Sequence, residues 1–492
     1  MNIKSLSNHK KIIEPAGEMK VPVVFHVSDD LMPGEETIQE LVNIASDSHV
    51  FHHIAALSDV HSKKGRKNPT GTVVASENFL LPQINDTAPN CGMRFLKTNL
   101  TDSDLSLENI DKLFNALLGP IPTKTYIGTK IPYSLVVDIC RFGLKPVTKY
   151  FKTRTKKEIE NTFRNGNFFS AQGGSASGGD IPSEKDITDA IPELFLWIGK
   201  YRLGILGAAG NHFLDLMKIT EIKNPEIAER FGIREGQYIF MMHTGSGLLG
   251  QYASYLYTPK IKEHMSQRLV LALGKMMWQT EKKKIYRELA KKISGYKNKD
   301  EFFAYEAGSP EGKMFITAHQ AAGNQGFANR SILTHNLDQT IEKVLGKNPE
   351  LELLYDSPHI FINREKHFGR DVWVHRNGAV RANAGEPIFI PSSMSTPMYL
   401  GVGTDENEST FFSAGHGTGR RKNPEKDKAA AKDELFQKME ERKVKLYNAK
   451  SKGVVYQDAG YYKDIEEVIA GMEENKIMKT VAKLKPIAVL MY

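Results

Sequence analysis

The sequence predicts a fold of the α+β class, in which mixed β-sheets are flanked by helices. Two neighbouring observations indicate it. Residues 23–27 form a mostly apolar, β-branched run after Pro22, as is typical of a strand, and residues 35–44 show helical periodicity after a Pro-Gly turn. Strand and helix are therefore mixed from the beginning of the chain.

The remaining elements continue this mixture. Helices are expected at residues 107–118, 186–198, 262–293 and 319–345, and strands at short apolar runs around Ile239, Trp373, Ile388 and Val402. Residues 170–182 are rich in Gly and Ser and predict a long loop rather than a linker between domains.

The chain has 492 residues, which allows two or three domains or one large fold. With 40% hydrophobic and 25% charged residues, it has enough apolar material for a substantial core. No internal repeat or domain boundary is evident. We therefore expect residues 1–492 to form a single large domain, with residues 1–54 as its less certain N-terminal portion.

The segments that bear on location are the apolar runs and the N-terminus. Runs such as residues 238–242 and 487–491 are too short to cross a bilayer, and residues 1–21 lack the apolar core of a secretory signal. Two cysteines, Cys91 and Cys140, do not suggest a disulfide framework. We expect a cytoplasmic protein with reduced thiols and no membrane partner.

A formal net charge of +8 is compatible with a polyanionic partner, because clustered Lys and Arg attract phosphates. Many basic proteins bind no nucleic acid, so the charge alone is a weak indication. The charge-dense residues 282–299 and 420–445 are interpreted as solvated helix faces in preference to an RNA surface.

Several histidines stand in short segments that contain Gly, Asn or Ser, namely at His61, His212, His243, His359 and His416. With Cys91 they supply a thiolate and several imidazoles, which suit zinc, manganese or a related divalent metal. No two of them have zinc-finger spacing, so a metal site would be assembled from distant loops. A lone histidine taken by itself is more often structural than a ligand.

The segment from His416 to Arg420 reads His-Gly-Thr-Gly-Arg. Glycines on either side of a small residue let backbone N–H groups close on an anion such as a phosphate. A neutral imidazole at this place can attack phosphorus, and Arg420 can balance the charge that develops. A tight glycine turn between two elements explains the same pattern, and the motif by itself favours that simpler interpretation.

Taken in order, these segments resemble the RtcB family of RNA ligases, from about Ala55 to the C-terminus. The matching stretches are residues 56–61, 90–100, 206–207, 211–215, 243–246, 324, 327–330, 374–379, 394–396, 416–420, 462–464 and 485–489. The resemblance implies an α+β catalytic domain around a central active-site cleft. It also implies a ligase that uses GTP and manganese.

In the chemistry that the resemblance implies, GTP guanylylates a histidine and GMP passes to an RNA 3′-phosphate, which can arise from a 2′,3′-cyclic phosphate. A 5′-hydroxyl then displaces GMP. His416 would be the nucleophile. Cys91 would bridge two manganese ions, with His212 on the first and with His243 and His359 on the second, although Cys and His also admit zinc.

The resemblance extends to the residues around the nucleotide and the RNA. The guanylate would be contacted by Asn211, Phe213, Ser392, Ser393, Met394, Ser395, Gly417, Thr418 and Gly419. Several cations would line the RNA path or bind its terminal phosphates: Arg94, Arg330, Arg376, Arg381 and, in a basic loop, Lys63, Lys64 and Arg66. A solvated loop is an equally good interpretation of that basic segment.

The sequence departs from the family pattern near the nucleotide and the first metal. Ala88 stands where the family has an aspartate ligand, and Asp86 is the doubtful replacement. Met491 replaces a lysine that contacts guanine. Further replacements are Gly247 for an arginine, Met398 for a serine and Ile360 for an asparagine. A preference for GTP over other nucleotides is therefore not assured.

Three functions compete. The first is a GTP- and manganese-dependent ligase that joins RNA 3′-phosphate or cyclic phosphate ends to 5′-hydroxyl ends. The second keeps one metal and processes RNA ends without joining them, and Ala88 and Met491 motivate it. The third is a catalytically weak RNA-binding homologue, against which the retained metal ligands and His416 count.

Overall fold

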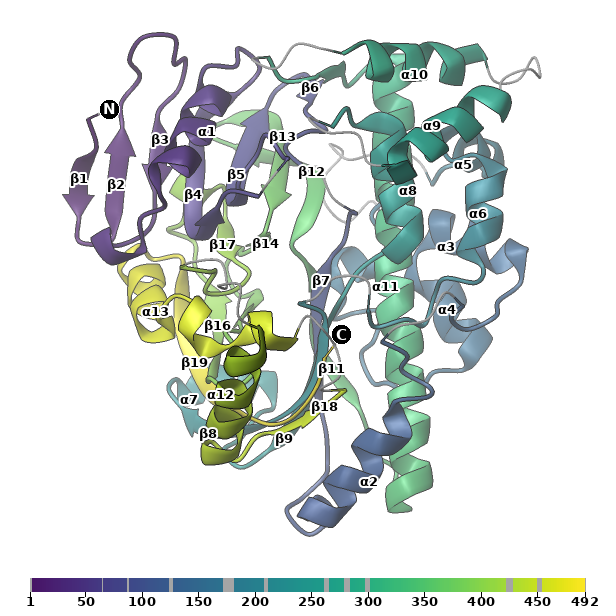
Figure 1. Cartoon of the computed structure of the whole chain (residues 1–492), viewed down its shortest axis with the longest axis vertical. Coiled ribbons are helices and arrows are strands. Elements are labelled where there is room, and N and C mark those ends of the chain that lie inside the picture. The colour runs from purple at the N-terminus through teal and green to yellow at the C-terminus, as the bar shows by residue number, and fades with distance from the viewer. Residues whose placement is uncertain are drawn as a thin grey trace.

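The computed structural model describes residues 2–63, 65–85, 88–123, 127–170, 181–207, 211–260, 265–277, 284–296, 301–421, 428–448 and 454–491. Strands gather on the side of the molecule that holds the N-terminus, and most helices gather on the other side (Figure 1). Mixed sheets and flanking helices confirm the predicted α+β class.

The N-terminal sheet has seven strands in the order β1-β2-β3-β4-β5-β13-β12. Their bounds are β1 (Lys4–Ser7), β2 (Lys10–Ile13), β3 (Val23–Phe25), β4 (Phe51–His61), β5 (Thr70–Ser76), β12 (Ile360–His367) and β13 (Arg370–Asn377). β3 pairs with β4 in parallel, which requires a crossover, and α1 (Glu35–Ala45) supplies it. The early strand and helix are thus confirmed. Whether the whole chain is one domain stays a prediction.

The second large sheet has eight strands, in the order β11-β7-β9-β8-β19-β16-β15, with β18 beside β19. Their bounds are β7 (Gly92–Lys97), β8 (Phe213–Ile222), β9 (Tyr238–Thr244), β11 (Glu352–Pro358), β15 (Pro387–Ile390), β16 (Met398–Gly403), β18 (Lys445–Tyr447) and β19 (Met478–Met491). The strands expected around Ile239, Trp373, Ile388 and Val402 are all present.

The helical side is built around α11 (Pro310–Leu345), which is buried on nearly every face in its middle. Around it lie α2 (Leu107–Leu117), α3 (Tyr133–Phe142), α4 (Leu144–Phe151), α5 (Glu184–Ala190), α6 (Glu193–Gly199), α8 (Gly247–Tyr257), α9 (Met265–Met277) and α10 (Lys284–Gly295). The helix expected at 186–198 is two helices, because Pro192 lacks the N–H that would continue α5. α11 begins at Pro310 and not at residue 319 as predicted, and Ser309 caps its N-terminus.

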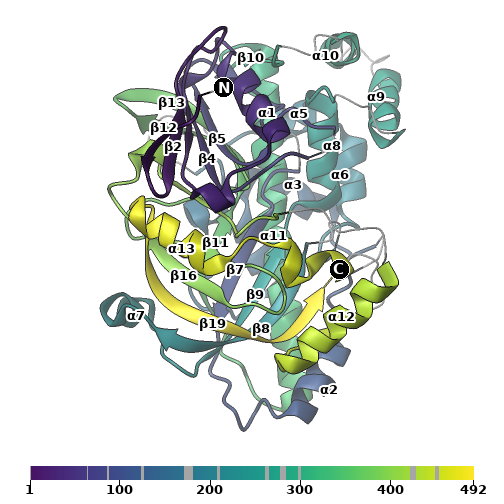
Figure 2. The same cartoon turned by 60° about the vertical axis from the view of Figure 1, so that its left-hand side comes forward.

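The remaining elements are shorter helices and strands. They are β6 (Phe79–Leu80), β10 (Tyr305–Glu306), β14 (Ala379–Arg381), β17 (Ser413–Gly415), α7 (Pro225–Phe231), α12 (Lys428–Glu441), α13 (Ile465–Glu474) and the 3-10 helices η1 (Asp29–Leu31), η2 (Phe163–Gly166), η4 (Glu408–Thr410), η5 (Val454–Gln457) and η6 (Ala459–Tyr461). α12 lies beside the C-terminal end of the long, curved β19 (Figure 2). β14 pairs with β17, Ala379 opposite Gly415, which brings residue 416 beside residue 378.

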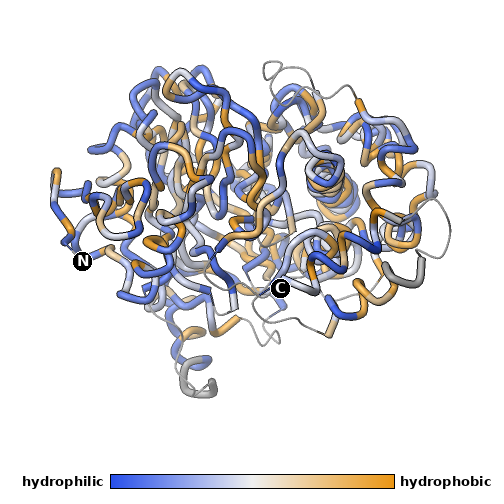
Figure 3. The backbone as a smooth tube through the Cα atoms, turned by 90° about the horizontal axis from the view of Figure 1, so that it is seen from above, coloured by the Kyte–Doolittle hydropathy of each residue, from blue (hydrophilic) through white to orange (hydrophobic). Residues whose placement is uncertain are grey.

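Apolar side chains are buried in separate clusters on the two sides of the molecule. One joins α3, α5, α6, α8 and α11, and another lies between α1 and the N-terminal sheet. Apolar and polar positions alternate along the tube in both halves (Figure 3), as expected where each element buries one face. Within the described residues, no helix combines the length and apolar character needed to span a membrane.

Candidate active site and metal centre

Three adjacent strands bring a cysteine and two histidines together. Phe213 of β8 pairs with His243 of β9, and Gly92 of β7 pairs with Thr244 of β9. Cys91 and His212 immediately precede β7 and β8, so this register places both beside His243. The Cys91 Sγ lies 3.4 Å from Nε2 of His212 and 3.3 Å from Nε2 of His243.

The hydrogen bonds of the two histidines aim their Nε2 atoms at the thiol. Nδ1 of His212 lies 2.9 Å from the Leu206 carbonyl oxygen, and Nδ1 of His243 lies 3.1 Å from that of Asn211. Each Nδ1–H donates to its carbonyl, which leaves Nε2 with a lone pair. Burial lowers the pKa of His212 to about 4, so its imidazole is neutral at pH 7.

These three residues fit a divalent metal. Their ligand atoms all lie within 4.8 Å of one another. In a tetrahedral zinc site, sulfur and nitrogen ligands are separated by about 3.6 Å, close to the spacings found here. Burial raises the pKa of the Cys91 thiol to about 11 despite the charge of Arg330, and binding of a cation would displace that proton.

His359 stands next to this group without being one of its three close members. Its ring centroid lies 5.0 Å from that of His243 and 4.2 Å from that of His416. Its Nδ1 is buried and has no hydrogen-bond partner among the described residues. A buried nitrogen of this kind suits a ligand atom, because its lone pair is otherwise unsatisfied.

Two groups hold the Nδ1 side of the His416 ring. Its Nδ1 lies 2.9 Å from the Gly378 carbonyl oxygen and 3.2 Å from Oδ2 of Asp59. The Nδ1–H donates to the Gly378 carbonyl and Asp59 lies beside it as an ion-pair partner, so Nε2 keeps the lone pair. Burial lowers the pKa of His416, and Asp59 opposes that shift. Burial opposes ionisation of Asp59, but His61 and His416 outweigh it and lower the pKa of this carboxyl to about 2.

The loop after His416 is shaped by close backbone contacts. The Gly417 carbonyl accepts a hydrogen bond from Ser58, and the Thr418 N–H donates to the Pro391 carbonyl. Gly419 has φ +76°, and a Cβ there would lie 2.6 Å from a carboxylate oxygen of Asp59. Glycine is therefore required at 419 by both the backbone conformation and the space.

A cavity of about 510 Å³ opens over His416 and His243. Most of the predicted nucleotide-binding residues line it: Asn211, Phe213, Ser392, Ser393, Met394, Gly417, Thr418 and Gly419. Ser395 is not among the lining residues; its hydroxyl and carbonyl instead accept hydrogen bonds from Arg442. Met398 and Met491 also line the cavity.

Among the described residues of the predicted basic loop, Lys63 lies at the cavity. Lys63 lines it together with Arg420, and the Arg66 N–H donates to the Lys63 carbonyl across a turn. Lys64, in the same loop, lies outside the described residues, as does the doubtful metal ligand Asp86.

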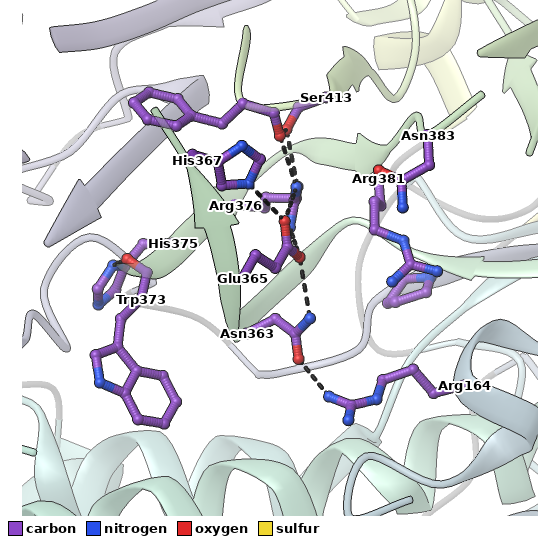
Figure 4. Close-up of polar contacts among 12 residues, drawn as sticks. Arg164, Asn363, Glu365, His367, Trp373, His375, Arg376, Arg381, Asn383 and Ser413 are labelled. Carbon is purple, nitrogen blue, oxygen red and sulfur yellow. Dashed lines mark hydrogen bonds and ion pairs between the residues drawn. The ribbon is translucent and has the colours of Figure 1, made fainter. Parts of the chain in front are cut away.

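Three arginines predicted to line the RNA path are fully buried and paired with carboxylates. Arg94 and Arg330 both pair with Asp356. Arg376 pairs with Glu365 within a cluster that includes His367, Asn363 and Arg164 (Figure 4). In this structure the three arginines compensate buried carboxylates, and RNA contact by them stays a prediction.

Two carboxylates of the cavity had no role in the sequence prediction. Asp59 lies in a matched stretch, two residues before His61, and its partner His416 is distant in sequence. Asp215, two residues after Phe213 on β8, also lines the cavity. Its Oδ1 is buried without a hydrogen-bond partner among the described residues, and burial raises its pKa well above the usual value.

Comparison with known proteins agrees with the matched motifs. A family model described as tRNA-splicing ligase RtcB matches residues 40–491. The chain belongs to the RtcB family. It is similar to the tRNA-splicing ligase RtcB of Nanoarchaeum equitans, with 28% identity over the whole of both chains. The RtcB of Thermococcus kodakarensis is 27% identical, over 96% of this chain and 95% of the relative. The RtcB of Methanococcus maripaludis is 28% identical, over 96% and 95%.

Membership of the RtcB family confirms the resemblance inferred from the motifs. In this RtcB chain, Cys91, His212, His243, His359 and His416 converge on one centre although they are separated by up to hundreds of residues. The cluster of Cys91, His212 and His243 is suited to a metal ion.

Proposed function

We propose that this protein joins RNA ends through a guanylylated His416, using GTP and manganese, and that it acts in the cytoplasm. Its substrates are an RNA 3′-phosphate or 2′,3′-cyclic phosphate end and a 5′-hydroxyl end. The observation that carries the proposal is the orientation of His416. Its Nδ1 faces the Gly378 carbonyl and Asp59, so its unprotonated Nε2 is available to the cavity.

The proposed reaction has three phosphoryl-transfer steps. The Nε2 lone pair attacks the α-phosphorus of GTP, the bond to the bridging oxygen breaks, and pyrophosphate leaves. An oxygen of the RNA 3′-phosphate then attacks the guanylate phosphorus, and cleavage of the phosphorus–nitrogen bond restores His416. Finally the 5′-hydroxyl attacks the activated phosphate and loses its proton as GMP departs. A cyclic phosphate is first opened by water.

The side chains around His416 support each transfer. Asp59 stays ionised and stabilises positive charge on the imidazole while the phosphorus–nitrogen bond exists. Lys63 and Arg420 line the cavity and can balance phosphate charge. A divalent cation held by Cys91, His212, His243 and His359 would withdraw further charge from the phosphates. One or two manganese ions are proposed, and zinc has the same ligand preferences.

The proposed nucleotide is supported by Asp215. Asp215 lines the cavity, and guanine offers two neighbouring N–H groups to a carboxylate. Met491 and Met398 add apolar surface on the same cavity wall. This combination accommodates a flat base and gives it one strong polar contact.

The test is covalent labelling with GTP that carries its label on the α-phosphate. Wild type, His416→Ala and a matched surface variant, His49→Ala, are incubated with manganese and then denatured. We expect acid-labile label on wild type and on His49→Ala, and none on His416→Ala. Labelled protein should then convert RNA with defined 3′-phosphate and 5′-hydroxyl ends into ligated product.

A second function is favoured by Ala88, which removes a carboxylate from the site of the first metal. In that case the protein would transfer guanylate to RNA ends without joining them. Label on His416 and capped RNA 3′ ends, with no ligated product, would support this alternative. Absence of label with GTP and with ATP, under manganese or zinc, would contradict both and leave RNA binding alone.

A further inference from the structure

Aromatic and basic side chains gather on α6, on α8 and on the segment that follows α6. We call this group the α6–α8 strip and define it by Tyr252, Tyr201, Lys200 and Trp197. α6 and α8 lie side by side in two views (Figures 1 and 2). The rings of Phe195 and Tyr252, tilted by 39° with their centroids 4.7 Å apart, join the two helices.

The strip begins near the active site. Lys63 and Arg420 line the cavity. A Cβ at Gly247, the first residue of α8, would lie 3.7 Å from the Arg202 carbonyl oxygen, so the start of α8 adjoins the segment that follows α6. Because α8 begins shortly after β9, which carries His243, this end of the strip lies near the metal centre.

The middle of the strip is Tyr252 on α8, whereas Tyr255, three residues further on, is buried in the helical core. Tyr252 is half-buried, and the positive charge of Arg202 lies near its hydroxyl and opposes the rise in its pKa that burial causes. The alternation of cation and aromatic ring thus continues from α8 towards α6.

The far end of the strip is an exposed aromatic platform. Trp197 is 49% exposed, which is unusual for so large an apolar side chain. Its ring lies edge-on to Tyr201 with centroids 5.4 Å apart. The Lys200 ammonium lies 4.2 Å from the Trp197 ring and 4.7 Å from the Tyr201 ring. The indole face and the ammonium are thus presented together at the surface.

We propose that the α6–α8 strip binds the single-stranded arm of the RNA whose end lies in the cavity. Exposed rings stack on bases of any sequence, and interleaved cations follow the phosphate backbone. A purely apolar partner would leave Lys200 without charge compensation, whereas RNA supplies phosphates beside stacking surfaces. The inference rests on the proposed function, because the RNA end in the cavity sets where the arm begins.

The test compares two labelled single-stranded RNAs that carry 3′-phosphates, one of about 12 nucleotides and one of about three. Trp197→Ala should weaken binding of the long RNA about five- to a hundredfold, as expected for a lost stacking contact, and leave the short RNA unchanged. Trp197→Phe should restore most of the affinity. Lys200→Gln should also lower the slope of log affinity against log salt by about 0.7.

Matched controls separate this effect from damage to the fold. Tyr150→Ala removes an equally exposed aromatic residue, 52% exposed, from α4, and Lys313→Gln removes an exposed lysine from α11. Neither should alter RNA affinity. Equal affinity of Trp197→Ala and wild type for the long RNA, or an equal loss for both RNAs, overturns the proposal. Labelling of His416 by GTP is measured separately, so failure of the ligase chemistry and failure of the strip are distinguishable.

Discussion

Oδ2 of Asp59 lies 3.2 Å from Nδ1 of His416, on the side of the imidazole opposite the nucleophilic nitrogen. The carboxyl comes from the end of β4 and the histidine from the residue after β17, so the N-terminal sheet directly supports the reactive group. A fixed Nδ1–H and a nearby negative charge both favour attack by Nε2.

Asp59→Asn should slow guanylylation of His416 by about 10- to 100-fold, the usual effect of losing a residue that orients a reactive histidine. The amide keeps the size of the side chain but removes the charge that stabilises the phosphorylated imidazole. The measurement is the single-turnover rate of label incorporation at saturating GTP and manganese. Asp405→Asn, which changes an exposed carboxyl group, is the control and should react like wild type.

The pH dependence of guanylylation follows from the lowered pKa of His416. Burial keeps the imidazole neutral at pH 7, and protonation removes the nucleophile as the pH falls below the ordinary value of about 6.5. The rate should therefore be flat from about pH 7 to 8 and decline in acid. Asp59 raises the pKa of His416, so Asp59→Asn should move the acid limb to lower pH. If the rate declines at the same pH in Asp59→Asn as in wild type, the two residues are not directly coupled.

Nucleotide choice should depend on the protonation of Asp215. When the carboxyl group is ionised, it accepts hydrogen bonds from both N–H groups of guanine. When it is protonated, it offers one hydrogen-bond donor and one acceptor, which match adenine. Burial raises the pKa of Asp215, so the preference for GTP over ATP should increase as the pH rises. The ratio of initial labelling rates from the two nucleotides, measured from pH 6 to 9, tests this.

Met491→Lys is the complementary change at the same cavity. Met491 lies opposite Phe213 where β19 pairs with β8, two residues from the pair formed by Val489 and Asp215. A lysine there would favour the ionised carboxylate and should increase GTP selectivity by about tenfold or more. Lys485→Met, elsewhere on β19, is the control. If the preference for GTP over ATP changes neither with pH nor in Met491→Lys, Asp215 does not form selective hydrogen bonds with the base.

The strand at β3, the strands around Ile239, Trp373, Ile388 and Val402, and the helices α1, α2 and most of α11 could be predicted because they depend on local patterns. Most of the predicted nucleotide-binding residues line the cavity because they belong to ordered family motifs. The buried arginines could not be predicted. Arg94, Arg330 and Arg376 resemble phosphate ligands in sequence, and only the fold reveals that Asp356 and Glu365 neutralise them. Asp59 was missed for the same reason, because its partnership with His416 exists only after two distant strands pack together.

Metal content should respond to Ala88→Asp and Cys91→Ser in opposite directions. Ala88→Asp returns a carboxylate near Cys91 and should increase bound manganese towards two ions per chain. Cys91→Ser removes the sulfur shared by His212 and His243 and should reduce bound metal severely. Elemental analysis after dialysis measures both, with Cys140→Ser as the control because Cys140 is buried in the helical core. Equal metal content in Cys91→Ser and wild type would exclude Cys91 as a ligand.

Acid should destabilise the fold partly through His53. This histidine is buried, stacks on Phe411 and lies 2.7 Å from the Ser409 carbonyl oxygen, and burial lowers its pKa to about 4. Between about pH 6.5 and 4 the unfolded chain binds a proton at this site and the folded chain does not. The free energy of unfolding should therefore fall as the pH falls, by up to about 1.4 kcal/mol per pH unit.

The variant that isolates this contribution is His53→Gln, which keeps a polar side chain but cannot titrate. Its free energy of unfolding, from denaturant titrations at pH 7, 6 and 5, should fall less steeply with acid than that of wild type. His9→Gln, at the partly buried pair with Glu474, is the control and should not flatten the slope. An unchanged slope in His53→Gln would mean that the acid sensitivity originates at the other buried histidines, such as His26, whose pKa burial lowers to about 3.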